Sequence, residues 1–166
     1  MKIIRWVGTF LVAIVLAAGI TASATRSADG PLAMFPGGEL VAGDWVDSTS
    51  ADAERLATTG QIEFQLLTPP RSRTTWVVVH EGEIYVPCGV PTVSFFKQWP
   101  HEAMKDGRAV IRFDGKRQRR TAVRVHDRDI RAALLREVAR KYPGPEGDVE
   151  DEDQAWFFRL DPRSEG

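Results

Sequence analysis

The sequence contains a single cysteine, Cys88, among its 166 residues. One thiol cannot form a disulfide within the chain, and it cannot supply the two or more cysteines of a typical zinc–thiolate site. Histidine is also scarce: His80, His101 and His126 share no spacing that is typical of metal ligands. We therefore expect neither a disulfide framework nor a metal centre.

Signature motifs of the common catalytic classes are missing as well. The chain has no G-x-S-x-G, no P-loop, no H-E-x-x-H and no kinase signature. A basic excess is also missing, because 22 Lys and Arg residues are balanced by 23 Asp and Glu residues, for a net charge of −1. Domains dedicated to nucleic-acid binding carry a clear basic excess. We expect no nucleic-acid partner.

Charged residues are absent from the N-terminal stretch 6–24, which follows Lys2 and Arg5 and ends in Ala22-Ser23-Ala24. A basic flank, an apolar run and a small-residue end are typical of a secretory signal peptide. As a helix, the stretch would also cover roughly 30 Å, enough to remain as a membrane anchor. Both alternatives stay open. In either case the positive flank stays inside, so the sequence predicts an extracytoplasmic domain, membrane-anchored or secreted.

The remainder has the length of one domain. Residues 25–43 are rich in Gly, Pro, Ser and Ala, which predicts a tether whose later part lies along the domain. Residues 44–166 then form the domain itself. A hydrophobic fraction of 43%, with five tryptophans and eight phenylalanines, suffices to build its core.

Strand patterns dominate this domain. Apolar residues alternate with polar ones over 62–66, which predicts a strand. Residues 68–72 (Thr-Pro-Pro-Arg-Ser) are expected to break the sheet, and the β-branched and aromatic residues of 74–79 predict the next strand. The strand over 74–79 is expected to form a hairpin with a strand over 84–86, with the turn at Glu81-Gly82. A second hairpin is expected between 109–113 and 121–125, because Asp114-Gly115 is a strong hairpin turn.

Helical patterns are fewer. Helices are expected over 94–106 and over 127–142, where Asp127 suits the N-cap and Pro143-Gly144 ends the helix. A short helix is plausible over 51–57, and a last strand is expected over 156–160. The pattern as a whole predicts a mainly-β α+β fold.

Five segments, taken in this order and at this spacing, carry a family resemblance: T-P-P-R-S-R-T-T-W-V-V-V (68–79), G-E-I-Y-V-P (82–87), K-Q-W-P-H-E-A-M-K-D-G-R-A-V-I-R-F-D-G-K (97–116), R-T-A-V-R-V-H-D (120–127) and W-F-F-R-L-D-P-R (156–163). Together they resemble the FMN-binding split-barrel superfamily, which includes pyridoxamine-phosphate-oxidase-like and deazaflavin-dependent nitroreductase-like proteins. The resemblance implies a split β-barrel of about six antiparallel strands with two short helices, here preceded by an N-terminal hydrophobic helix. It also implies a homodimer with a flavin-type cofactor, FMN or a deazaflavin, near the subunit interface.

By the same resemblance, a cofactor phosphate is expected at residues 71–75, where two arginines, a serine and two threonines lead into a strand. Arginine forks match phosphate oxygens bidentately, and hydroxyls and loop amides can complete such a site. Further along the sequence, Lys97 and Trp99 could lie along the cofactor ring. The alternative for residues 71–75 is a solvated loop, and the alternative for Trp99 is a core residue that packs a helix onto the barrel. The candidate residues are Arg71, Ser72, Arg73, Thr74, Thr75, Lys97 and Trp99.

A run of four positive charges lies over 116–120. It could contact a phosphate tail or anionic lipid headgroups, but a solvated hairpin tip explains it more simply. Two functions follow from the whole sequence. The first is a membrane-associated protein that uses a flavin-type cofactor for electron or hydride transfer to a small acceptor. The alternative is a noncatalytic extracytoplasmic binding or scaffold module with the same barrel.

Overall fold

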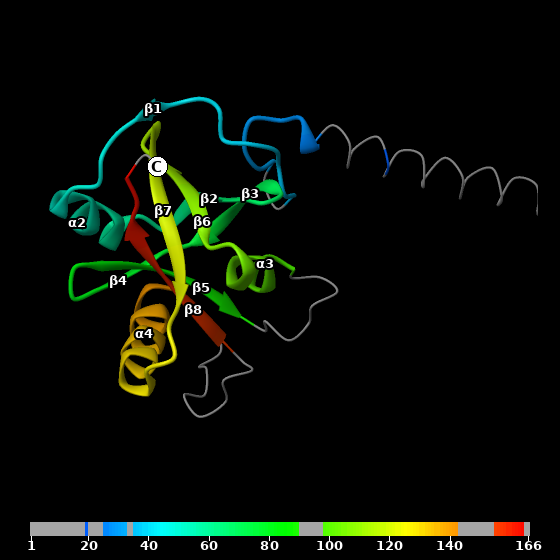
Figure 1. Ribbon diagram of the computed structural model, residues 1–166. Coiled ribbons are helices and arrows are strands. Elements are labelled where there is room, and N and C mark those ends of the chain that lie inside the picture. The colour runs from blue at the N-terminus through cyan, green and yellow to red at the C-terminus, as the bar shows by residue number, and fades with distance from the viewer. Residues whose placement is uncertain (1–18, 20–24, 33–34, 90–97, 143–154, 165–166) are drawn as a thin grey trace, which may run out of the picture.

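The computed structural model describes residues 19, 25–32, 35–89, 98–142 and 155–164. These residues form one sheet of eight strands together with three helices (Figure 1). In chain order the elements are β1 (Asp44–Trp45), α2 (Ser50–Thr58), β2 (Gln61–Leu67), β3 (Pro70–Trp76), β4 (Val78–His80), β5 (Glu83–Gly89), α3 (Trp99–Lys105), β6 (Arg108–Phe113), β7 (Lys116–Arg124), α4 (Arg128–Lys141) and β8 (Ala155–Pro162).

The sheet has the strand order β3-β2-β6-β7-β8-β5-β4, and all neighbours in this order are antiparallel. Only the two-residue β1 is parallel to its partner, β7. The first and last strands of the order, β3 and β4, are consecutive in the chain, and β3 also contacts β5. The two ends of the sheet, β3 on one side and β4 with β5 on the other, therefore approach each other without a ladder between them, and the sheet forms a barrel that is open on this side. This confirms a mainly-β α+β fold, with more strands and one more helix than expected.

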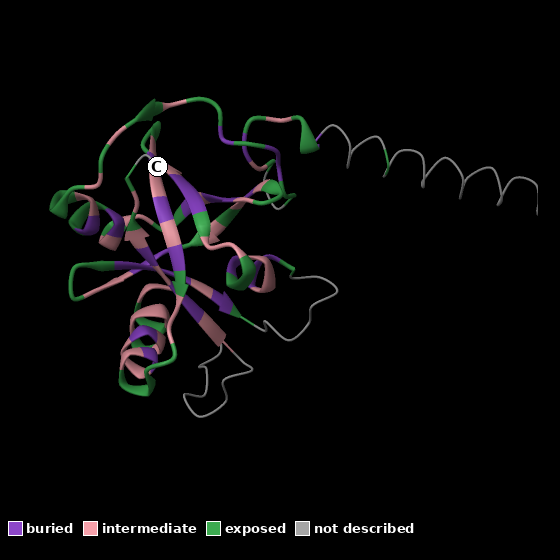
Figure 2. Ribbon diagram, viewed as in Figure 1, coloured by how far each residue is buried: buried purple, intermediate pink, exposed green. Residues whose placement is uncertain are grey.

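Local sequence explains the turns of the two predicted hairpins, and both turns are present. The expected strand over 74–79 is divided, however: only β4 pairs with β5, while residues 74–76 belong to β3 and pair with β2. Asp114 and Gly115 adopt φ values of 49° and 70° between β6 and β7, and Glu81 and Gly82 adopt 51° and 79° between β4 and β5. Two consecutive residues with positive φ form the tight turn that matches the twist of the flanking strands. Buried positions concentrate on β2, β5, β6 and β8, which surround the core (Figure 2).

One expectation about β3 was wrong. The stretch 68–72 was expected to break the sheet ahead of a strand over 74–79. Instead, Thr68 and Pro69 make a turn, and β3 starts at Pro70 and pairs with β2 along its length. Proline is tolerated here because β3 is an edge strand, whose outer backbone groups need no ladder partner. Residues 71–73 are therefore strand residues and not part of a loop.

The helices partly follow the predictions. Helix α3 lies within the expected range 94–106, of which 94–97 are outside the described residues, and α2 occupies the range where a short helix was plausible. Helix α4 has 14 residues and is capped by Asp127, whose carboxylate accepts from the backbone N–H groups of Asp129 and Ile130. No helix in the described part of the chain is long and apolar enough to cross a membrane. The predicted N-terminal helix lies, apart from Gly19, outside the described residues.

The later part of the predicted tether packs on the outside of β2 and β3. Leu40 is 1% exposed, and its N–H donates to the Gln65 side chain at 2.7 Å. The Ser72 hydroxyl donates to the Gly38 carbonyl at 2.6 Å, while Gly37 bridges to the Ser72 backbone. At Gly37 a Cβ would lie 1.7 Å from the Gly30 carbonyl oxygen, so only glycine fits there. This segment belongs to the folded unit.

The C-terminal end of α4 is fixed by Tyr142. Its hydroxyl lies 2.5 Å from the Gly60 carbonyl oxygen and accepts from the Val77 N–H at 3.1 Å. The Tyr142 ring stacks on Trp76.

We expect Tyr142→Phe to lower the free energy of unfolding by about 1–3 kcal/mol, because partly buried backbone groups lose their hydrogen-bond partner. Urea unfolding of the full-length chain in a neutral detergent measures this. Tyr85→Phe is the control, since its hydroxyl has no hydrogen bond among the described residues. Equal stability of Tyr142→Phe and the wild type would contradict the assignment.

Candidate functional site

The register of β2 and β3 divides the predicted phosphate-binding residues between two faces. Arg71 is opposite Leu66, Arg73 opposite Phe64, and Thr75 opposite Ile62. Directly opposite residues share a face of the sheet, and these three partners belong to the core. Both arginines therefore lie on the core-facing side of β3, at the opening of the barrel. Ser72 and Thr74 lie on the other side, so the five residues do not form a single cradle.

The two hydroxyl residues on the outer side have different surroundings. Ser72 is fully buried beneath the Gly37–Gly38 segment and uses its hydroxyl proton on the Gly38 carbonyl. Thr74 is exposed. Neither is adjacent to the guanidiniums on the core-facing side. Thr75 is the one predicted hydroxyl that shares that side with Arg71 and Arg73.

The structure brings Arg73 and Trp99 together. The Arg73 guanidinium carbon lies 5.6 Å from the centre of the Trp99 ring. Trp99, at the start of α3, is 7% exposed and packs against Phe64 at 5.4 Å and Phe158 at 5.1 Å between ring centres. Trp99 is thus a core residue that joins α3 to the barrel and supports Arg73 by a cation–π contact. Lys97 lies outside the described residues.

The arginine environment is electrostatically unfavourable without a ligand. Burial lowers the pKa of Arg73 to about 10, the nearby Glu102 carboxylate partly opposes this effect, and Arg71 adds to it. The Nε atoms of both Arg71 and Arg73 are buried and have no hydrogen-bond acceptor among the described residues. A buried donor without an acceptor costs free energy. Oxygen atoms of a bound anion would satisfy both donors, so the residues fit a phosphate group.

A second aromatic cluster, centred on Trp156, lies next to Phe158, which itself contacts Trp99. Trp156, on β8, lies 6.5 Å from Phe158 between ring centres and carries the Arg124 guanidinium 3.6 Å above its own centre. His101 meets the Trp156 ring edge-on at 5.1 Å. The Trp156 Nε1 atom is buried and has no acceptor in the described part of the chain. This group was not predicted from the sequence, because its residues come from β7, β8 and α3 and are brought together only by the register of the two strands and the position of the helix. The alternation of Trp156 and Phe158 was the only available signal.

The basic run 116–120 is mostly engaged in the structure. Arg120 is 2% exposed and donates to the Leu160 carbonyl and to Gln118, whose amide donates to Asp52. Arg117 donates to the carbonyls of Gly43 and Leu40. The expectation of a solvated hairpin tip was therefore wrong for this part of the run. The reason is that β7 extends through the run and its alternate side chains enter the barrel.

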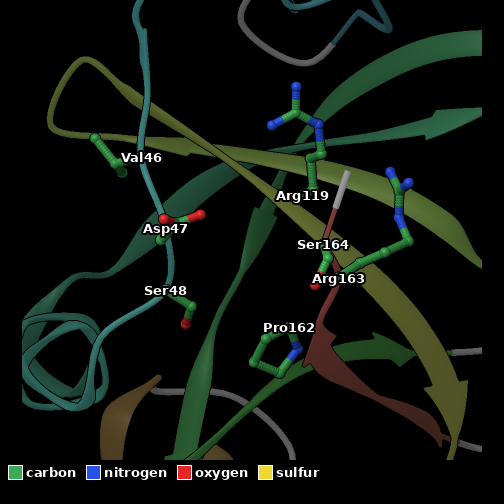
Figure 3. A pocket seen from close by; sticks show the side chains of 7 residues that line it. All are labelled: Val46, Asp47, Ser48, Arg119, Pro162, Arg163 and Ser164. Carbon is green, nitrogen blue, oxygen red and sulfur yellow. The ribbon is translucent and has the colours of Figure 1, made fainter. Parts of the chain in front are cut away.

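A separate hollow of about 400 Å³ lies where the chain end meets β7 and the segment before α2 (Figure 3). It contains two arginines and two serines but none of the predicted site residues. Within the described ranges, no three His, Cys, Asp or Glu side chains gather closely enough to hold a metal ion. The hollow is lined by Val46, Asp47, Ser48, Arg119, Pro162, Arg163 and Ser164.

No protein-family model matches the sequence, and no curated protein matches it either. Solved structures do match. A conserved hypothetical protein from Mycobacterium tuberculosis has a TM-score of 0.55 at 18% identity, over 73% of this chain and 84% of that chain. A candidate pyridoxamine 5′-phosphate oxidase from Listeria innocua has a TM-score of 0.51 at 11% identity, over 69% and 94%. A NimC/NimA family protein from Clostridium acetobutylicum has a TM-score of 0.52 at 16% identity, over 66% and 79%. At these identities the likeness shows the fold alone, which is that of the split-barrel proteins.

Proposed function

We propose that this split-barrel chain binds a flavin-type cofactor, FMN or a deazaflavin, and that Arg71 and Arg73 hold its phosphate. The observation that carries the proposal is the pair of buried guanidinium Nε atoms on the core-facing side of β3, for which the described residues offer no acceptor. Two half-buried positive charges on one edge strand are costly unless an anion neutralises them. The fold of the Listeria candidate oxidase supports the same ligand class by analogy.

The chain's own residues would then bind and orient the cofactor. Arg71 and Arg73 would donate to the phosphate oxygens, and the cation–π contact with Trp99 would keep the Arg73 guanidinium in position. Lys97, just ahead of α3 in the sequence, would supply a positive charge near the ring. The bound cofactor would itself supply electron or hydride transfer to a small acceptor. Such a transfer requires no nucleophile–base pair, and the sequence suggests none.

The experiment is a thermal melt of the full-length chain, in a neutral detergent, with saturating FMN, FAD or a deazaflavin. A ligand that binds only the folded state raises the melting temperature in proportion to the logarithm of its concentration. We expect FMN or the deazaflavin to do so. If none of the three cofactors shifts the melting temperature of a folded sample, the proposal is wrong.

A noncatalytic binding or scaffold module remains the second candidate. Two observations favour it: Ser72 already uses its hydroxyl on Gly38, and Trp99 is too buried to stack on a ligand ring. Both remove contacts that were expected for a cofactor. This candidate predicts a folded chain that no flavin stabilises, which is the opposite result in the same melt.

We also propose that residues 6–24 direct the domain to the extracytoplasmic side of a membrane. The support is the charge-free run behind Lys2 and Arg5. Fractionation of cells that express the full-length chain should place it with the membranes, at full mass if the segment is an anchor. A shortened, soluble and exported product would instead assign a cleaved signal peptide. A full-length product in the cytosolic fraction would contradict both.

A further inference from the structure

The segment that joins the charge-free N-terminal run to the barrel carries two adjacent apolar side chains on its surface. Leu32 is 51% exposed and Phe35 is 54% exposed. Their backbones form an antiparallel bridge, with hydrogen bonds of 3.1 Å and 3.0 Å in the two directions. Directly opposite residues of such a bridge direct their side chains to the same side. The Leu32–Phe35 pair therefore presents one apolar surface to the solvent.

The chain around this pair is fixed to the folded unit. Ahead of the pair, the Ala28 N–H donates to the Thr25 carbonyl at 3.2 Å, and the Ala28 carbonyl accepts from the Gly38 N–H at 3.1 Å. After the pair, Gly37 exchanges two backbone hydrogen bonds with Ser72 of β3, at 2.9 Å and 3.2 Å. The chain from Thr25 onward thus belongs to the folded unit, and the barrel is held close to the end of the charge-free run.

This attachment limits the distance between the pair and the run. Leu32 follows Thr25 by seven residues, which span at most roughly 25 Å when fully extended. The hydrogen bond between Ala28 and Thr25 shortens this span. In Figure 1 residues 25–32 lie at the upper right of the barrel, and α4 lies at its lower left. With the run 6–24 in a bilayer, the Leu32–Phe35 pair would lie near the bilayer surface and α4 far from it.

The pair and the proposed cofactor site are on different sides of β3. The segment that carries the pair packs on the outer side of β3, where the Ser72 hydroxyl donates to the Gly38 carbonyl. Arg71 and Arg73 lie on the core-facing side of the same strand. A contact made by the outer segment would therefore leave both arginines uncovered, and it is independent of cofactor binding.

We propose that the Leu32–Phe35 pair inserts into the surface of the lipid bilayer and thereby orients the barrel on the membrane. The proposal rests on the membrane role proposed above for residues 6–24. Adjacent exposed apolar side chains, unlike scattered ones, are typical of contact sites, and leucine and phenylalanine are typical of segments that lie in the membrane interface. Pro31 and Pro36 flank the pair and restrict the backbone, so little conformational freedom is lost on insertion.

The test places an environment-sensitive dye on single introduced cysteines of the full-length chain, reconstituted in phosphatidylcholine vesicles. The variants are Leu32→Cys and Phe35→Cys, and the matched control is Val123→Cys, an exposed apolar position at the α4 end of β7. The wild type gives the background labelling, because Cys88 is buried. We expect the dye at 32 and 35 to emit at a shorter wavelength than at 123. Nitroxide-labelled lipid should quench most of the emission at 32 and 35 and leave that at 123.

Flotation of the same vesicles separates failure of this contact from failure of the membrane segment. If the chain floats with the vesicles but lipid quenches the dye at 32 and 35 no more than at 123, residues 6–24 bind the membrane and the proposed contact is wrong. If the chain does not float, the membrane role of residues 6–24 fails and the contact fails with it. A dye whose emission shifts without quenching by lipid is covered by protein, such as a second copy of the chain, and this result also overturns the proposal.

Discussion

Replacing Arg71 and Arg73 together with alanine should abolish the thermal stabilisation of the chain by FMN or a deazaflavin. Each guanidinium would donate charge-assisted hydrogen bonds to the phosphate, and each such bond contributes about 1.5–3 kcal/mol. The loss of both arginines should weaken cofactor binding by at least about 100-fold. The variant should still fold, because neither Nε atom has a protein acceptor to lose in the described part of the chain. A fluorescence titration of FMN gives the affinity, and circular dichroism checks the fold.

The control for this variant is Arg55→Ala with Arg140→Ala, which removes the same charge from exposed positions on α2 and α4. This pair should leave cofactor affinity unchanged, since exposed ion pairs contribute little. If both double variants weaken binding equally, the effect is one of overall charge and the phosphate lies elsewhere. If only the Arg71/Arg73 variant loses binding, the site on β3 is supported.

Arg73→Leu alone should make the cofactor-free chain more stable. Burial lowers the pKa of Arg73 to about 10 in the folded state, below the ordinary value of an arginine, so folding must desolvate a charge at neutral pH. Between these two values the unfolded chain binds more protons, so wild-type stability rises with pH there, and below about pH 10 the full cost is present. Leucine removes this cost while it keeps an apolar side chain against the core, and we expect a net gain of roughly 1–3 kcal/mol. Urea unfolding at pH 7 measures it.

The same variant should lose affinity for the cofactor. A residue that lowers stability while it supports binding is typical of a functional site. Arg112→Leu provides the contrast, because its guanidinium forms ion pairs with Glu63 and Asp29. That substitution leaves two carboxylates unpaired and should destabilise the chain. If Arg73→Leu were destabilising to the same degree, Arg73 would be a structural residue and the binding role would be contradicted.

The local elements could be predicted from the sequence because their signals are local. Asp114-Gly115 and Glu81-Gly82 specify tight turns, and the alternation at 62–66 specifies a strand with one buried side. The Thr68-Pro69 turn was misread as the end of the sheet, because a proline before a basic stretch is typical of a loop. Only the pairing of Leu67 with Pro70 shows that the strand resumes at once.

The candidate site could be predicted only as a stretch of sequence. Residues 71–75 were expected to act together, but alternation along β3 places Arg71 and Arg73 on one side and Ser72 on the other. The contacts of Arg124, His101 and Trp156 depend on strand register and on the position of α3, which no short motif encodes. The hollow lined by Arg119 and Arg163 could not be predicted for the same reason, because its lining residues come from separate parts of the chain. The membrane segment and the homodimer remain predictions.

The central claim is that Arg71 and Arg73 bind a cofactor phosphate, and the most direct test compares FMN with riboflavin, which lacks only that phosphate. The affinities of both compounds are measured by flavin fluorescence for the wild type and for Arg71→Ala/Arg73→Ala. We expect the wild type to bind FMN at least about 100-fold more tightly than riboflavin, and the variant to bind both equally weakly. Equal affinity of the wild type for the two compounds, or an FMN preference that survives the double substitution, would contradict the claim.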